Sequence, residues 1–285
     1  MKTTFLLLFL CLSFQAQAQI QTPALSPLAT STQQVGITTI SLQYWRPSTR
    51  GRAIFGENGT LPKGEFWRTG ANGATKITFS SDVIIGGKPL SAGSYTLLSI
   101  PGKSSWQVNW YAYETGTWTD YVEKEPLLTM SLPVQETGIH METLRIDLQD
   151  IALHSANLSI EWETTLIKIP IEVDDKARIL SSIERTMAGP SNFDYFQAAL
   201  YLHESGTDLN KALEYIQNVT KSEGALFFQV TREAQILQDL GKNERALKVT
   251  RRALLLSQEA NNMDFIRLNN KIMKEVSESI KNENR

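Results

Sequence analysis

Arginine and asparagine side chains gather in one stretch of this sequence, residues 44–74, which reads YWRPSTRGRAIFGENGTLPKGEFWRTGANGA. Guanidinium groups bind carboxylates through paired N–H donors, and an amide both donates and accepts hydrogen bonds. If Arg46, Arg52, Arg68 and Asn72 converge on one opening, they form a site for a polar ligand such as a sugar or a carboxylate. We therefore take these four residues as candidate ligand-binding groups.

Aromatic rings accompany these polar groups and offer a surface on which a ligand can stack. Trp45 and Trp67 lie in the same stretch, and either can form the stacking wall. Trp118 belongs to a second aromatic segment, residues 110–126, which we expect to supply the facing wall. That segment has another interpretation, as the contact surface with the second half of the chain. Trp67 and Trp118 complete the candidate set.

A purely structural interpretation of residues 44–74 stays open beside the ligand-binding one. In it, Trp67 fills the edge of the core, and Arg68 pairs with Glu57 or Glu65 while it donates to loop carbonyl oxygens. A connection of this length without regular periodicity is uncommon inside a compact domain, and its aromatic content argues against disorder. Under either interpretation we expect an ordered loop that folds onto a sheet.

Other reactive residue types do not stand at spacings that identify a site. His140, His154 and His203 have no partner at a metal-ligand spacing, so no metal site is predicted. Glu161 and Glu163 share one face of a predicted strand, and we expect that face to be solvated. The sequence contains neither a complete phosphate-binding loop nor a nucleophile elbow, so no cofactor and no catalytic residue are predicted.

A hydrolase acting on glycans of the cell envelope or the secretome is the alternative to a non-enzymatic binding module. Such an enzyme needs two carboxyl groups across a cleft. They would come from Glu57, Glu65, Asp120 or Glu123. No pattern assigns an acid and a base among these four, so the binding module is the preferred interpretation.

The elements that position these residues change character near Val173. Before it, apolar and polar residues alternate in short segments separated by Gly, Pro, Asn and Ser, which predicts an all-β antiparallel sandwich, jelly-roll or barrel-like in form, over residues 19–173. These segments lie around residues 40–44, 77–79, 83–85, 95–100, 106–110, 128–132, 144–148, 158–162 and 167–171.

After Val173 the composition shifts to Ala, Leu, Glu and Lys with helical periodicity, so residues 174–285 are expected to form a smaller all-α domain. Two Ala-Leu pairs, 212–213 and 246–247, stand 34 residues apart, which is the period of tetratricopeptide helical hairpins. Leu240-Gly241 resembles the turn of that repeat, whereas Ser-Gly-Thr-Asp at 205–208 replaces it in the first unit. We expect this domain either to contact a protein partner or to stabilise the sandwich.

The first 18 residues, MKTTFLLLFLCLSFQAQA, combine a lysine, a short apolar run and a final Ala-Gln-Ala. This order is typical of a cleaved secretory signal, and the run is shorter than the ~20 residues that span a bilayer. We expect an exported protein, periplasmic or secreted, without a transmembrane segment. The remaining chain has no Cys, so it has neither disulfides nor thiolate sites. A formal net charge of −2 argues against a nucleic-acid partner.

Three runs of residues resemble a bacterial family. They are QTPALSPLATSTQQVGITTISLQYWRPSTRGRAIFG, FWRTGANGATKITFSSDVIIGGKPLSAGSYTLLSIPG and WETTLIKIPIEV. Over about residues 20–173 they look like the bacterial domain-of-unknown-function family 2911. The resemblance implies an exported bacterial protein with an appended helical repeat, and it transfers a fold and a compartment but no reaction.

Overall fold

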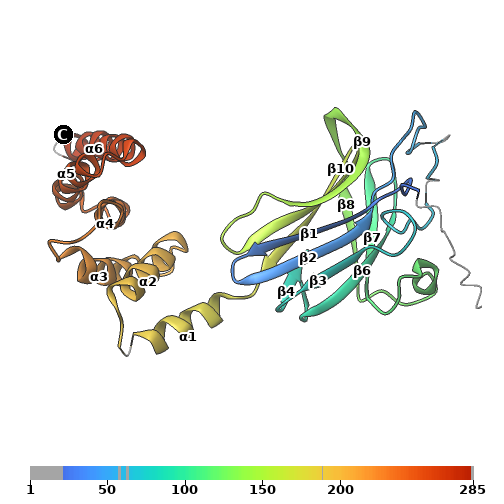
Figure 1. The fold of residues 1–285 in the computed structure, drawn as a ribbon, viewed down its shortest axis with the longest axis horizontal. Coiled ribbons are helices and arrows are strands. Elements are labelled where there is room, and N and C mark those ends of the chain that lie inside the picture. The colour runs from blue at the N-terminus through green and yellow to red at the C-terminus, as the bar shows by residue number, and fades with distance from the viewer. Residues whose placement is uncertain (1–21, 57–58, 62–63, 188, 284–285) are drawn as a thin grey trace, which may run out of the picture.

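The structure of the chain is a computed structural model that describes residues 22–56, 59–61, 64–187 and 189–283 (Figure 1). Within these residues, ten strands are followed by six α-helices, and a short 3-10 helix, η1 (Trp118–Tyr121), lies among the strands. Figure 1 shows the helices leading away from the strands, with the first helix between the two parts. The expected secretory signal, residues 1–18, lies outside the described residues, and so does Glu57.

The strands form two antiparallel sheets that pack into a sandwich. The six-stranded sheet has the order β1-β2-β3-β6-β7-β8, and the four-stranded sheet has the order β5-β4-β10-β9. The strands are β1 (Leu28–Val35), β2 (Thr38–Trp45), β3 (Lys76–Phe79), β4 (Val83–Ile85), β5 (Lys88–Leu90), β6 (Gly93–Ile100), β7 (Ser105–Ala112), β8 (Leu128–Pro133), β9 (Gln135–Gln149) and β10 (Ser155–Val173). The predicted sandwich is confirmed, and the sheets do not close into a barrel.

The alternation in the sequence explains how the core forms. Ile40, Leu42 and Tyr44 of β2 point inward, and each is at most 4% exposed. They share one core cluster with Ile169 and Ile171 of β10, which are fully buried. Burying one such aliphatic side chain stabilises the fold by about 1.5–3 kcal/mol. The predicted strands therefore hold the two sheets together.

Two strands differ from the period-two prediction. The edge strand β1, LATSTQQV, was not predicted because most of its residues are polar and exposed. β10 is one continuous strand where the sequence predicts two, because shifts of register on both sides of Glu163 let the strand continue past an irregularity. Glu163 has a φ of 51°, a left-handed conformation that is costly for a residue with a side chain.

The helices pack in chain order, each against the next from α2 onward. Ala199, Ala212, Ala246 and Ala253 are fully buried, which allows the helices to approach closely. The helices are α1 (Lys176–Thr186), α2 (Asn192–Glu204), α3 (Leu209–Thr220), α4 (Phe227–Asp239), α5 (Asn243–Glu259) and α6 (Met263–Glu283). None of the helices in the described ranges is long and apolar enough to cross a membrane.

The turns that end α2 and α4 have the same construction although their sequences differ. Gly206 and Gly241 each come directly after the C-cap residue of the helix, with φ angles of 59° and 67°. This left-handed position after a helix favours glycine. The Ser-Gly-Thr-Asp segment at 205–208 therefore takes the same place in the α2–α3 turn as Leu240-Gly241 takes in the α4–α5 turn.

A buried carboxylate links the helices to the sandwich. Asp175, between β10 and α1, accepts a hydrogen bond from the Ile37 amide at 2.8 Å, and its other oxygen lies 2.6 Å from Nδ1 of His154. Nε2 of His154 lies 3.3 Å from the hydroxyl of Tyr201 on α2. One hydrogen-bonded network thus connects the β1–β2 turn, the β9–β10 turn, the segment between the two parts of the chain and α2.

Candidate functional site

Two of the predicted arginines bind carbonyl oxygens of the backbone. Nε of Arg46 donates to the carbonyl of Leu144 at 2.9 Å. Nε and Nη2 of Arg52 donate to the carbonyls of Thr49 and Ser48, both at 2.9 Å. These bonds fix the start of the long loop that follows β2.

Trp67 lies in the core rather than on the surface. It is 6% exposed, and its indole N–H donates to the carbonyl of Gly70 at 3.0 Å. Its ring stacks on Trp162 with centroids 5.8 Å apart and meets the edge of Trp106 at 5.7 Å. The backbone of Trp67 also pairs with Ser99 of β6, so the loop extends the six-stranded sheet at this point. The predicted role of Trp67 at the core edge is confirmed.

Arg68 points to the opposite face of that sheet, because consecutive residues of an extended segment face opposite ways. Its guanidinium carbon lies 5.4 Å from the centre of the Trp118 ring. Its Nε is buried without a hydrogen-bond partner, and desolvation lowers the pKa of Arg68. Within the described residues Arg68 forms no ion pair with Glu65 and donates to no loop carbonyl, so these parts of the structural interpretation are wrong; the other predicted partner, Glu57, lies outside those residues.

Asn72 occupies a turn with a φ of 54°, which asparagine adopts more readily than most residues. Its side chain is exposed, and Nδ2 donates a long bond of 3.4 Å to the carbonyl of Ser26. The structure therefore brings Arg68 and Trp118 together. Within the described residues, the other predicted site residues form no hydrogen bond or ring contact with that pair: Arg46, Arg52, Trp67 and Asn72.

A hollow of 300 Å³ opens beside this pair, on the outer face of the six-stranded sheet, and we call it the outer-face hollow. Trp45 and Tyr113 line it together with Gln43. The full lining is Leu28, Gln43, Trp45, Gly73, Ala74, Tyr113 and Gly116. Trp45 is one of the two predicted stacking walls, and Tyr113 belongs to the segment predicted to face it, so one cavity brings these two residues together.

Local structure explains how the hollow forms. Gln43 and Trp45 alternate with the inward residues of β2, so both face outward. The amide of Ala74 donates to the carbonyl of Gly116 at 2.8 Å and joins the two loops that cover this face. A Cβ at Gly73 would lie 3.1 Å from that same carbonyl oxygen, closer than an ordinary contact, so the close approach of the loops favours a residue without a side chain.

The groups around the hollow suit a polar ligand with an apolar face. Nζ of Lys76 lies 4.8 Å from the centre of the Tyr113 ring and brings a positive charge to this side of the sheet. The indole N–H of Trp45 and the side-chain amide of Gln43 form no hydrogen bond with the rest of the described chain and are available to a ligand. None of the residues that line the hollow carries a carboxyl, imidazole or thiol group.

The described carboxylates that could serve a hydrolase, and the pair Glu161 and Glu163, lie outside the outer-face hollow. Glu65, Asp120 and Glu123 are exposed and do not line the hollow. Glu161 is buried rather than solvated, and its carboxylate accepts hydrogen bonds from Arg145 and from Gln149, both at 2.6 Å. Glu163 accepts from the amides of Ile54 and Phe55 at 2.9 and 3.3 Å and so anchors the long loop. The expectation of a solvated face was wrong for Glu161.

Sequence reasoning missed Gln43 and Leu28 as residues of the hollow. The alternation of β2 carries a signal for Gln43, since it shares a face with Trp45. Leu28 had no comparable signal, because β1 lacks an apolar period and its pairing with Trp45 is visible only in the folded sheet.

The fold and the hollow define a two-sheet β-sandwich protein with an appended helical domain. A family model described as protein of unknown function (DUF2911) matches residues 26–171, and the chain belongs to that family. This match confirms the resemblance carried by the loop and strand motifs. Searches of curated proteins and of solved structures found no match.

Proposed function

We propose that this chain is an exported, non-enzymatic binding protein of the bacterial cell envelope, and that its sandwich holds a polar small molecule or glycan unit in the outer-face hollow. The observation that supports the proposal is that Trp45 and Tyr113, from β2 and from the loop after β7, line one cavity. Aromatic rings bind the apolar face of a sugar ring, while nearby amide and N–H groups bond its hydroxyls.

The size of the hollow limits the ligand. A volume of 300 Å³ stands at the lower end of the roughly 300–1,000 Å³ typical of ligand pockets. One saccharide ring, free or at the end of a longer glycan, fits this range. Lys76 beside Tyr113 favours a ring that carries a carboxylate over one that carries an amine.

Export is part of the proposal and is supported by the sequence of residues 1–18, with its lysine, apolar run and Ala-Gln-Ala end. The expected compartment is the periplasm or the extracellular medium. Mass spectrometry of the protein from fractionated cells tests this expectation. A mature chain that begins at Gln19 outside the cytoplasm is the expected result, and an intact chain in the cytoplasm contradicts it.

The helical domain is proposed to be tetratricopeptide-like and to contact a protein partner. Its support is the equivalent construction of the α2–α3 and α4–α5 turns at Gly206 and Gly241. Helical hairpins that repeat in this way present extended surfaces that suit protein partners.

A glycan screen tests the proposed function. The purified mature protein is applied to an array of neutral and acidic oligosaccharides, and each glycan that binds is incubated with the protein while reducing ends are assayed. Saturable binding without turnover is the expected result. Release of reducing ends would favour the hydrolase alternative, and absence of binding to all glycans would contradict a glycan ligand.

A further inference from the structure

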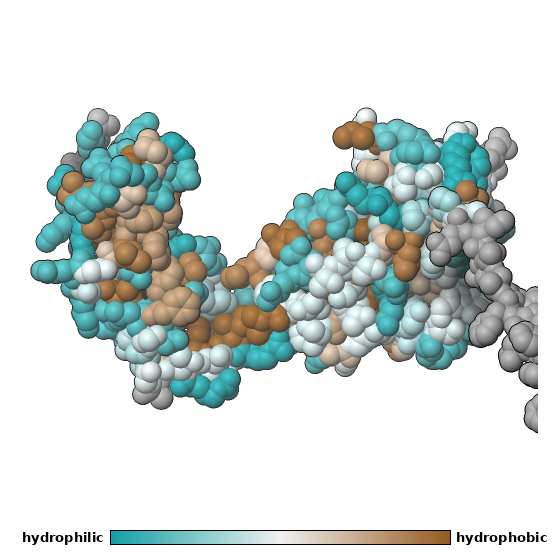
Figure 2. All heavy atoms as spheres, in the orientation of Figure 1, coloured by the Kyte–Doolittle hydropathy of each residue, from teal (hydrophilic) through white to brown (hydrophobic). Residues whose placement is uncertain are grey.

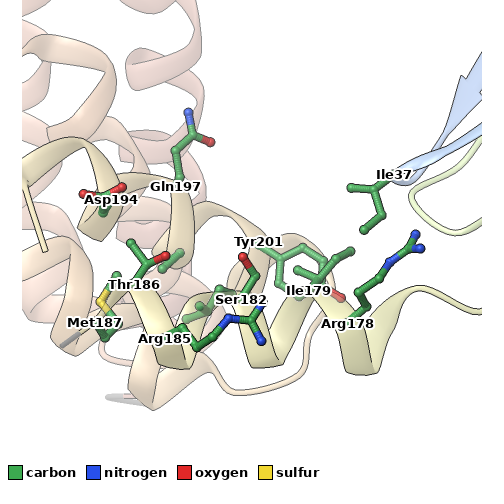
Figure 3. Close-up of a pocket in the computed structure, with 12 residues that line it drawn as sticks. Ile37, Arg178, Ile179, Ser182, Arg185, Thr186, Met187, Asp194, Gln197 and Tyr201 are labelled. Carbon is green, nitrogen blue, oxygen red and sulfur yellow. The ribbon is translucent and has the colours of Figure 1, made fainter. Parts of the chain in front are cut away.

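A groove between α1 and α2 forms a second cavity (Figure 3), and it shares no lining residue with the outer-face hollow. Its volume is 380 Å³, and it extends along α1 to Ile37 in the turn between β1 and β2. We call it the α1–α2 groove. Figure 3 shows Arg178 next to Ile37 at one end and Thr186 and Asp194 toward the other.

The floor of the α1–α2 groove is aliphatic. Ile37, Ile179, Ile183 and Ala198 contribute to it, and Ile37 is 45% exposed. α1 has no buried residue, so its apolar side chains are only partly covered. Figure 2 shows apolar side chains, in brown, gathered over α1 between the sandwich and the other helices. A ligand that covers this stripe buries apolar surface and so gains affinity. The same ligand stabilises α1, because an 11-residue helix is only marginally stable by itself in water.

One edge of the groove is cationic. Arg178 and Arg185 both line it, and neither forms an ion pair within the described residues. Each makes one bond to a serine hydroxyl: Arg178 to Ser81 at 3.5 Å and Arg185 to Ser181 at 2.8 Å. Both guanidinium groups therefore retain donors for an anion.

One acid also lines the groove, but it is engaged. Asp194 accepts from the amide and the hydroxyl of Ser191, at 2.9 and 2.6 Å, in the capping box of α2. These two bonds hold the carboxylate at the start of α2, and they lower the pKa of Asp194. The positive charge of the two arginines therefore exceeds the negative charge at this groove.

We propose that the α1–α2 groove binds a free aliphatic carboxylate, with its chain on the isoleucine floor and its carboxylate on the arginine edge. The volume favours a small molecule over a protein segment. At 380 Å³ the groove is near the lower limit for drug-sized ligands, whereas a partner helix has a diameter of about 10 Å and needs a wider surface. This site shares no residue with the outer-face hollow, so its failure leaves the proposed function unaffected.

Calorimetric titration of the full mature chain tests the proposal, with octanoate, decanoate and dodecanoate below their micelle concentrations. Affinity is expected to rise with chain length by up to about fourfold for each buried CH₂. Decyltrimethylammonium, a cation with a ten-carbon chain, is expected to bind at least tenfold more weakly than decanoate. The double variant Arg178→Gln/Arg185→Gln is expected to lose at least about tenfold in decanoate affinity, because a charge-assisted bond is removed.

Matched variants separate the groove from general effects. Arg251→Gln removes an exposed arginine of α5 that does not line the groove, so decanoate affinity is expected to stay unchanged. Ile179→Ser changes the floor without touching the buried cluster of the helical domain, and a several-fold loss is expected. If Ile179→Ser lowers the thermal midpoint, Ile37→Ser replaces it as the floor variant, because Ile37 lines the same groove from the sandwich side.

Four results would overturn the proposal. They are no saturable binding of dodecanoate, equal binding of the carboxylate and the ammonium compound, affinity that is unchanged in the double arginine variant, and affinity that is unchanged in both floor variants. Binding to vesicles that contain anionic phospholipid, without binding of dodecanoate, would instead identify α1 as a membrane-surface helix.

Discussion

The guanidinium carbon of Arg68 lies 5.4 Å from the centre of the Trp118 ring, and this contact joins the two loops that cover the outer face of the six-stranded sheet. The same loops meet again where the Ala74 amide donates to the Gly116 carbonyl at 2.8 Å. Gly73, Ala74, Tyr113 and Gly116 line the outer-face hollow. Arg68 is thus placed to hold the shape of the hollow without lining it.

A double-mutant cycle measures the Arg68–Trp118 contact. A cation over a tryptophan ring contributes about 0.5–2 kcal/mol, depending on how far it is desolvated. We expect a coupling free energy of about 0.5–1 kcal/mol between Arg68→Ala and Trp118→Ala in urea unfolding. Arg52→Ala serves as the control, because Arg52 binds only its own loop, and it should not couple to Trp118. Additive effects of Arg68→Ala and Trp118→Ala would show that the contact is not energetically significant.

Trp67→Ala is expected to destabilise the protein strongly, by about 3–5 kcal/mol, because the substitution empties a buried site among aromatic rings. Trp118→Ala is the comparison, since Trp118 is only partly buried and should cost less. Chemical denaturation of both variants gives the two free energies of unfolding. A loss below about 1 kcal/mol for Trp67→Ala would contradict its place in the core.

Gly36→Ala is expected to disrupt the network that joins the helices to the sandwich. Gly36 has a φ of 55°, and a Cβ there would lie 2.0 Å from Oδ2 of Asp175. The left-handed conformation alone costs a non-glycine residue about 1–2 kcal/mol. Gly87→Ala is the matched control, because Gly87 has a φ of 81° but open space around it.

Unfolding in urea should therefore show a larger loss for Gly36→Ala than for Gly87→Ala, and limited proteolysis should cut Gly36→Ala faster between β10 and α1. Equal losses in the two variants would mean that the collision with Asp175 is relieved at no cost.

The pH dependence of stability is expected to include Glu142. Hydrogen bonds from the Thr49 hydroxyl, first, and from the Arg50 amide hold the pKa of Glu142 below its ordinary value. A carboxylate with a lowered folded pKa contributes stability that is full above the unfolded pKa, about 4.3 for glutamate, and is lost as the pH falls through the folded pKa. Stability should thus decrease from about pH 5 downward.

Glu142→Gln should flatten that acid limb in urea unfolding measured between neutral and acidic pH. Glu136→Gln is the control, since Glu136 is an exposed glutamate on the same strand, β9. If both variants keep the acid limb of the wild type, Glu142 does not contribute to it.

The sandwich could be predicted because its core strands alternate strictly, as Ile40, Leu42 and Tyr44 do in β2. The edge strand β1 could not, since an edge strand with few buried residues leaves no apolar period. The single long β10 was also missed, because a register shift at Glu163 depends on pairing with β9.

The candidate site was predicted only in part. Trp67 and Arg68 are neighbours in the sequence, and for that reason both were assigned to one ligand site. Consecutive residues of an extended segment face opposite ways, so these two side chains cannot contact the same ligand. Arg68 and Trp118 were both predicted, but their contact joins residues 50 positions apart and has no local signal. The loop contact between Ala74 and Gly116, which shapes the hollow, is equally long-range.

The most direct test of the proposed function is calorimetric titration, with a glycan that binds, of the wild type and of Gln43→Ala, Trp45→Leu and Gln34→Ala. Gln34 is an exposed glutamine on β1 outside the hollow and serves as the matched control for Gln43. We predict at least tenfold weaker binding for Trp45→Leu, several-fold weaker binding for Gln43→Ala, and unchanged binding for Gln34→Ala, with the thermal midpoint of Gln43→Ala equal to that of the wild type. Unchanged affinity in both Trp45→Leu and Gln43→Ala would contradict a ligand site in the outer-face hollow.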